Sequence, residues 1–237
     1  MYGVPAVPSV SPGAGPIPQV GFQQPTNLFR FGEQTIWSTQ LYQGTAGAGG
    51  AAIANTTNRI FTTPQGQQGQ GFARALSIAE TNLKQGGQVP AGIAYDVFGV
   101  ATEVALLSDG TDAAGTFATP IDTQAQIGQL LNIVHNTILQ WDFTQTQIDI
   151  CPVLLAGAGG GAFGAVSQNA AAANSGHMNN GNGNIWMYQK HPVALPGQTT
   201  FAIQLRVGSR AANVTQNTSI SARVVLLGYY KNVIEIG

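Results

Sequence analysis

Short apolar runs separated by glycine, asparagine and proline set the strongest limit on how this chain can fold. Such runs suit strands of about four to eight residues better than helices, which need longer periodic segments. We expect strands over 35–42, 59–63, 91–107, 139–143, 148–154, 185–189, 200–207 and 221–236. Residues 73–83 fit a strand or a helix equally well. The pattern predicts eight to ten strands without a β-α-β rhythm, and therefore an all-β fold.

One segment, residues 122–137, has the spacing of a short amphipathic helix. Asp122 or Thr123 can serve as its N-cap. Its apolar residues recur at helical intervals, at Ile127, Leu130, Leu131 and Val134. We expect this helix to cover one sheet as a lid rather than to form a layer of its own.

These elements predict a single jelly-roll-like β-sandwich of two antiparallel sheets, with four strands in each sheet. No internal duplication is present, so one domain is expected over residues 29–237. In 91–107, the apolar residues indicate burial on both faces of the strand. Elsewhere alternation predicts the core residues, which include Leu139, Trp141, Phe143, Phe201, Ile203 and Leu205.

Residues 1–28 differ from the rest of the chain. They contain six of the twelve prolines and no charged residue. Proline removes backbone donors and opposes helix formation, so this segment cannot build a sheet of its own. Its spaced valines, with Ile17 and Phe22, supply apolar area. We therefore predict an extended N-terminal arm that lies on a neighbouring molecule.

Charge is scarce along the whole chain. Only 8% of its residues are charged, against about 25% in an average globular domain. Amides supply the polarity instead, with 23 Gln and 15 Asn. A neutral, amide-rich exterior suits a protein covered by copies of itself. The formal net charge is −1 and the nine basic residues form no cluster, so we expect no sequence-specific nucleic-acid partner.

A glycine-rich stretch raises the question of a nucleotide site. Gly159, Gly161 and Gly164 spell G-x-G-x-x-G directly after an apolar run. A dinucleotide site also needs a following helix and an acidic residue about 20 positions further on. Residues 165–184 contain no Asp or Glu and are rich in glycine and asparagine. We therefore predict a surface loop and no bound cofactor.

Catalytic and metal-binding patterns are missing from the sequence. His135, His177 and His191 are far apart and have no second ligand nearby. The acidic pair Asp109 and Asp112 lies in a predicted turn, where aspartate is common. The single cysteine, Cys151, lies in an apolar run, which favours a buried and inert thiol. We predict no catalytic residue, no metal site, no cofactor and no enzyme activity.

A glycan-binding or spike-like jelly-roll protein is the main alternative. Lectins with a jelly-roll fold stack aromatic side chains on sugars, and Trp141, Trp186 and Tyr188 could serve this purpose. Trp141 alternates with apolar residues, however, which favours a core position. The sequence has no recognisable secretory signal and no run of 18 consecutive apolar residues.

Two segments resemble the jelly-roll structural proteins of tailless icosahedral phages. These are ETNLKQGGQVPAGIAYDVFGVATEV (80–104) and LQWDFTQTQIDICPVLLAGAGGG (139–161), and KHPVALPGQTTFAIQLRV (190–207) fits the same plan. The likeness is one of order: a glycine turn into a buried strand, then a hairpin that opens into a glycine-rich loop. It extends over roughly residues 29–236, but the basic arm of many capsid proteins is missing.

The resemblance implies a capsid protein located in the virion, with assembly as its function and no catalytic residues. Its implied partners are copies of itself and other virion structural proteins, and contact with an internal membrane is left open. Together with the neutral composition and the arm, this gives our sequence-based expectation of a self-assembling shell subunit.

Overall fold

A computed structural model describes residues 27–43, 53–107, 124–143, 146–160, 184–188, 190–211 and 219–235 of the protein. Within these ranges lie ten strands, one α-helix and one 3-10 turn, η1 (Val153–Ala156). The strands are β1 (Asn27–Gln43), β2 (Thr57–Ile60), β3 (Ile93–Leu107), β4 (Thr137–Phe143), β5 (Thr146–Pro152), β6 (Gly157–Gly160), β7 (Trp186–Met187), β8 (Val193–Leu195), β9 (Phe201–Val207) and β10 (Ser219–Glu235). The predicted arm falls outside the described residues, apart from its last two positions, which already belong to β1.

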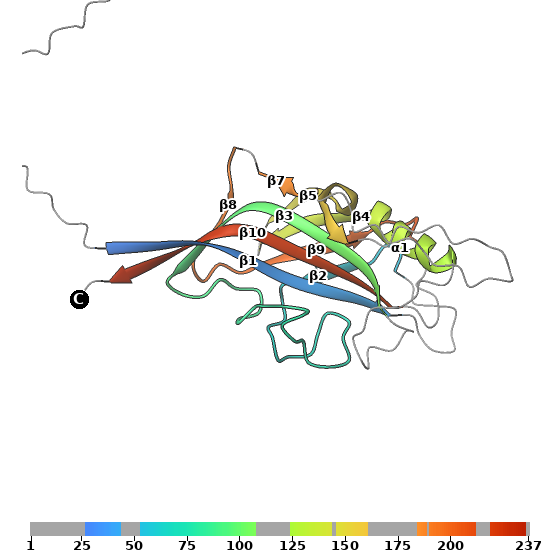
Figure 1. The fold of residues 1–237 in the computed structure, drawn as a ribbon, viewed down its shortest axis with the longest axis horizontal. Coiled ribbons are helices and arrows are strands. Elements are labelled where there is room, and N and C mark those ends of the chain that lie inside the picture. Colours follow the sequence, from blue (N-terminus) through green and yellow to red (C-terminus); the bar gives the residue numbers. More distant parts are fainter. Residues whose placement is uncertain are drawn as a thin grey trace, which may run out of the picture.

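The strands form two sheets packed face to face (Figure 1). One has the order β1-β10-β3, with the short strands β6, β7 and β8 along the far edge of β3. The other has the order β2-β9-β4-β5. All strand pairs are antiparallel except β3 with β6. The predicted all-β sandwich is therefore confirmed, but its sheets have six and four strands instead of four each.

The order of pairing is nested along the chain. The first strand pairs with the last, β2 with β9, β3 with β8, and β4 with its successor β5. Nested antiparallel pairing is what results when one long hairpin is rolled into two layers, and this is the arrangement of a jelly roll. Each sheet therefore combines strands from distant parts of the sequence.

The interior lies between the two sheets and matches the predicted alternation. Of the six predicted core residues, five are buried and Phe143 is half-buried against the core; the five are Leu139, Trp141, Phe201, Ile203 and Leu205. Trp141 stacks on Phe143 and also meets the ring of Phe201. The helix α1 (Gln124–Asn136) contributes Leu130, Ile133 and Val134 to the same core.

Helix α1 confirms the predicted helix, and its place explains its role. It contacts β3 of one sheet and β5 of the other, together with η1. Figure 1 shows it at the end of the sandwich opposite the free ends of β1 and β10. It therefore closes one end of the space between the sheets. Its predicted N-cap residues, Asp122 and Thr123, lie outside the described part of the chain.

Several strand limits differ from the sequence-based expectation. The run 59–63 ends as a strand at Ile60, because Phe61 adopts a positive φ of 65°. Residues 185–189 keep only the two-residue strand β7. The strand expected over 148–154 ends at Pro152, and Leu154 belongs to η1. Ile148 and Leu154 are 50% and 41% exposed. Residues 73–83 form neither a helix nor a regular strand.

Residues 70–82 run along the outer edge of β1, and we call this segment the edge belt. The belt supplies partners to four alternate residues of β1 in place of a neighbouring strand. The bonds run from Leu41 N–H to Gln70 O (2.9 Å), from Gln70 Nε2 to Thr39 O (2.7 Å), from Trp37 N–H to Asn82 Oδ1 (3.0 Å), from Thr81 Oγ1 to Trp37 O (3.1 Å) and from Asn82 Nδ2 to Thr35 O (2.8 Å). The exposed edge of a sheet is thereby closed over this length.

One feature lets the edge belt lie close to β1, and another fixes the shape of the belt itself. Gly71 has a φ of +84°, and a Cβ at this position would lie 2.2 Å from the carbonyl oxygen of Leu41, so only glycine fits. Glu80 accepts two hydrogen bonds from Arg74, at 3.0 and 3.2 Å, and two more from the backbone and hydroxyl of Ser77. Burial favours the neutral acid, but these bonds outweigh it and lower the pKa of Glu80 to about 2.

Replacing a fully buried core residue should cost far more than replacing an exposed one on the neighbouring strand. Ile203 is 0% exposed, whereas Ile138 is 43% exposed on the outer face of β4. We expect Ile203→Ala to lower the free energy of unfolding by about 2–5 kcal/mol, and Ile138→Ala by about 1 kcal/mol or less. Urea unfolding measures both, and equal losses would contradict the assigned facing of β4 and β9.

The bonds to Glu80 should make part of the stability depend on acid pH. Since folding lowers the pKa of this carboxyl from 4.5 to about 2, its contribution is complete above about pH 4.5 and is lost as the pH falls to about 2. We expect Glu80→Gln to lose about 2 kcal/mol at pH 7 and to flatten the stability profile between pH 4.5 and 2. Glu103→Gln is the control, because Glu103 and its partner Arg223 are both about a third exposed at 31–32%. An unchanged profile in Glu80→Gln would refute this role.

Candidate functional site

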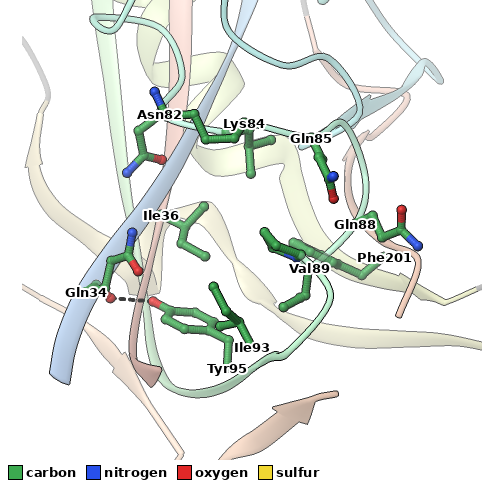
Figure 2. A pocket seen from close by; sticks show the side chains of 12 residues that line it. Gln34, Ile36, Asn82, Lys84, Gln85, Gln88, Val89, Ile93, Tyr95 and Phe201 are labelled. Carbon is green, nitrogen blue, oxygen red and sulfur yellow. Dashed lines mark hydrogen bonds between the residues drawn. The ribbon is translucent and has the colours of Figure 1, made fainter. Parts of the chain in front are cut away.

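A pocket of about 180 Å³ opens where β1, β3 and the loop before β3 meet. Figure 2 shows Ile36, Val89 and Ile93 around its interior, with the ring of Tyr95 beside them. The amides of Asn82, Gln85 and Gln88, together with Lys84, also line it. The pocket thus combines an apolar interior with polar groups from the loop.

This pocket has neither the size nor the groups of a catalytic site. Pockets for substrates and cofactors usually enclose about 300–1,000 Å³. None of the twelve lining residues is an acid, a histidine, a cysteine or a serine. The hydroxyl of Tyr95 lies within hydrogen-bond distance of the backbone oxygens of both Gln34 and Leu226, which share its one proton, and burial raises the pKa of its phenol. It therefore serves as a neutral cross-link between strands.

The glycine-rich stretch is described only in part. Gly157–Gly160 forms strand β6, which pairs in parallel with β3 around Thr102. Gly159 thus lies within a strand at the sheet edge. Gly161 and Gly164, which complete the motif, lie outside the described residues.

The residues considered for chemistry do not come together where they are described. His135 is exposed near the end of α1, and His191 is exposed before β8. His177, Asp109 and Asp112 fall outside the described ranges. No group of three or more His, Cys, Asp or Glu residues among the described positions could hold a metal ion. Cys151 is buried, and burial raises the pKa of its thiol to about 11, so the thiol stays protonated and unreactive.

The three aromatic residues considered for sugar stacking pack into the sandwich instead. Trp141 is 2% exposed and donates its indole N–H to the hydroxyl of Tyr188 at 2.8 Å. Trp186 and Tyr188 are half-buried and pack against the core. Trp141 is therefore a core residue, as its alternation predicted, whereas Trp186 and Tyr188 keep part of their surface exposed.

The outer face of the four-stranded sheet is polar, and its groups bind one another. Arg59 pairs with Asp142 at 2.7 Å across β2 and β4. Gln140 donates to Asp149 at 2.8 Å, and Gln204 lies opposite Gln140 in the register. These side chains make local polar contacts, and among the described residues of this face Ile138 is the exposed large apolar side chain.

The outer face of the six-stranded sheet has the opposite character. Five apolar or aromatic residues gather on it, and we call them the outer apolar patch: Phe98, Ile185, Met187, Leu227 and Tyr229. Phe98 and Tyr229 stack with centroids 4.9 Å apart. A Cβ on Gly99 would lie within 3.5 Å of Ile185, Met187 and Leu227, so these three surround one point. Ile185, Met187 and Tyr229 are 39%, 47% and 44% exposed.

Two ion pairs lie to either side of the outer apolar patch on the same face. Lys231 pairs with Asp96 beside Tyr229, and Arg223 pairs with Glu103 at 2.7 Å on the other side. Each pair is neutral as a unit. Around the patch the face therefore offers apolar area, two internally neutral ion pairs and one further acid, Glu33, opposite Tyr229. Apolar area with few charges is the character of the centre of a protein–protein interface.

Sequence reasoning did not single out this patch, although a signal for it was present. A strand with one face in water alternates apolar and polar residues, but VVLLGYY (224–230) is a continuous apolar run. The run in β3 was interpreted as burial on both faces, whereas Phe98 is only half-buried and no described element covers the patch. Locating the outer apolar patch from these runs required the strand register, which brings β3, β7 and β10 side by side.

Comparisons with protein families and with curated proteins identified no relative. No protein-family model matches the sequence, and no curated protein matches it. In the described part of the chain, no helix is long and apolar enough to span a membrane.

Proposed function

We propose that this protein is a capsid protein, a virion structural subunit that assembles with copies of itself into an icosahedral shell. The outer apolar patch carries the proposal. Burial of apolar surface drives association with about 25 cal/mol per Å². A patch supplied by continuous apolar strands, with no described element over it, fits a subunit whose neighbours complete its burial.

The distribution of charge supports the same function. Arg59, Arg74, Arg223 and Lys231 each form an ion pair with an acid of the same chain. These cations are spread over both sheets, whereas phosphate binding needs a cluster of unpaired ones. A neutral subunit also adds little electrostatic repulsion when many copies come together. Other virion structural proteins are further partners in this proposal, and direct sequence-specific contact with the genome is not.

The N-terminal arm has a part in the proposal although it lies outside the described residues. Residues 1–28 supply apolar area and prolines in a stretch without charge. Such a segment can bury its valines only against another surface. We therefore assign the arm to contacts between subunits. A glycan-binding jelly roll is the alternative, and a glycan column that retains the protein would favour it.

The first test is assembly of the purified protein. We expect the full chain to form closed particles of uniform diameter, detected by light scattering and by negative-stain electron microscopy. Folded monomers that stay monomeric at high protein concentration and in high salt would overturn the proposal. Aggregates of irregular size would also count against it, because a shell needs contacts of defined geometry.

A matched pair of variants tests whether the outer apolar patch makes the contacts. Met187→Glu places an unpaired charge at a patch position that is 47% exposed. Ile138→Glu places the same charge on the outer face of the other sheet, at a residue 43% exposed. We expect both variants to keep the circular dichroism spectrum of the parent, but only Met187→Glu to lose particles at least tenfold. Equal assembly of the two variants would exclude the patch as an interface.

A further inference from the structure

Half of strand β1 has an edge that nothing in the described structure covers. Successive residues of a strand direct their backbone groups to alternate sides. In β1 the odd-numbered residues face away from β10, as the edge-belt bonds to Thr35, Trp37, Thr39 and Leu41 establish. The odd-numbered residues before Thr35 are Asn27, Phe29, Phe31 and Glu33, and among the described residues their outward N–H and C=O groups have no partner.

The same part of β1 belongs to a ribbon of only two strands at its end. Strand β3 joins β10 at the pair Ile93 and Asn232. Beyond this point, 27–29 pairs with 233–235 alone. Figure 1 shows this end of β1 and β10 extending from the sandwich. A two-stranded ribbon is marginally stable in water, and a third strand stabilises it.

The chain protects its other long edges from such pairing. Strand β2, at one edge of the second sheet, has only four residues. Strand β5, at the opposite edge, is paired through a register shift and ends at Pro152. Short strands, bulges and proline are the usual means of preventing edge pairing. On β1 the protection stops at Thr35, so the open edge is confined to 27–34.

We propose that this open edge pairs antiparallel with the same edge of a second copy, about a two-fold axis at residue 31. In this register residue 31 lies opposite residue 31 of the second copy, 29 opposite 33, and 28 opposite 34. The three pairs formed by odd residues give about six backbone hydrogen bonds between the copies. Both copies satisfy the open groups of residues 29, 31 and 33 in a single isologous contact.

Geometry limits the choice of register. Outward groups lie only on odd-numbered residues, so an odd-numbered residue must lie opposite an odd-numbered residue of the second copy. The sum of the two residue numbers is the same for every pair in one register, and it must therefore be even. A sum of 60 places Arg30 directly opposite the same residue of the second copy, which is unfavourable for like charges. A sum of 64 brings residue 29 onto Thr35, whose carbonyl already binds Asn82. The sum of 62 places Arg30 opposite Gly32, and it meets Thr35 only at residue 27, outside the three pairs counted above.

A second copy fits this edge better than the arm does. The added strand must offer an N–H at every second residue. Prolines divide residues 1–26 into pieces of at most six residues. Residues 27–34 contain no proline and already form a strand. The inference rests on the proposed function, because it names one of the contacts through which copies associate.

Cysteine cross-linking tests the pairing and its register. In a Cys151→Ala background the chain has no other thiol. Opposed residues of antiparallel strands have Cα atoms about 4.5–5.5 Å apart, within the range of a disulfide. We therefore expect Phe31→Cys to form a covalent dimer on mild oxidation. A mixture of Leu28→Cys and Gln34→Cys should also give a dimer.

Leu28→Cys alone is the matched control. Two copies of residue 28 would be separated by six residues along the strands, about 20 Å, so no disulfide should form. No dimer from Phe31→Cys, or equal dimer from Leu28→Cys alone, would overturn the proposal. A disulfide from a Val20→Cys and Phe31→Cys mixture, with none from Phe31→Cys alone, would identify the arm as the occupant and would also overturn it.

A second pair of variants does not depend on disulfide chemistry. Phe31→Pro removes one outward N–H and leaves the bonds to β10, whereas Phe31→Ala keeps that N–H. We expect Phe31→Pro to weaken dimerisation at least tenfold more than Phe31→Ala in sedimentation equilibrium, and equal effects would overturn the pairing. The two proposals fail separately. Cross-linked dimers without particles contradict the capsid function, whereas normal particles without the cross-link contradict only the edge pairing.

Discussion

Strand β10 is hydrogen-bonded along both of its edges, and the rest of the sandwich depends on this pairing. It joins β1 over all 17 residues of the strand and β3 over most of them. Its inward residues Val224 and Leu226 are completely buried. Since β1 begins at residue 27 and β10 ends at residue 235, the central strand can form only after nearly the whole chain has been brought together. Such distant pairing predicts slow folding.

A bulge in β10 shows how tightly this centre is packed. The register with β3 shifts between Leu227 and Gly228. A Cβ on Gly228 would lie 2.6 Å from the ring of Tyr95 and 2.6 Å from the carbonyl of Asp96. The absence of a side chain lets Tyr95 lie across the strand, where its hydroxyl bonds β1 at Gln34 and β10 at Leu226. One phenol therefore ties three strands at the point where the outer apolar patch lies on the opposite face.

The sequence predicted what depends on local pattern and missed what depends on register. Alternation identified Trp141, Phe201 and Ile203 as core residues, because a period of two fixes the facing of a strand. The edge belt escaped prediction, since its hydrogen bonds join residues about 30–47 positions apart and leave no periodic trace. Strand β6 on the edge of β3 was not predicted, because its residues belong to a glycine-rich run that indicated a loop. The outer apolar patch was visible as a run of apolar letters, but its location required the pairing of β3 with β10.

The open edge and the outer apolar patch have a consistent geometry. Tyr229 of the patch pairs with Glu33, which lies within the open edge. A two-fold axis perpendicular to the sheet keeps the outer faces of both copies on one side. Edge pairing would therefore set two patches on the same face of a continuous sheet, next to the shared axis.

Backbone pairing supplies direction and register, whereas apolar burial supplies area without direction. Because the ion pairs beside each patch are internally neutral, placing the two patches side by side adds little like-charge repulsion from these pairs. Arg30 and Glu33 lie near the axis, and the proposed register places neither opposite the same residue of the second copy. The scarcity of further charge in the sequence limits like-charge contact in the same way.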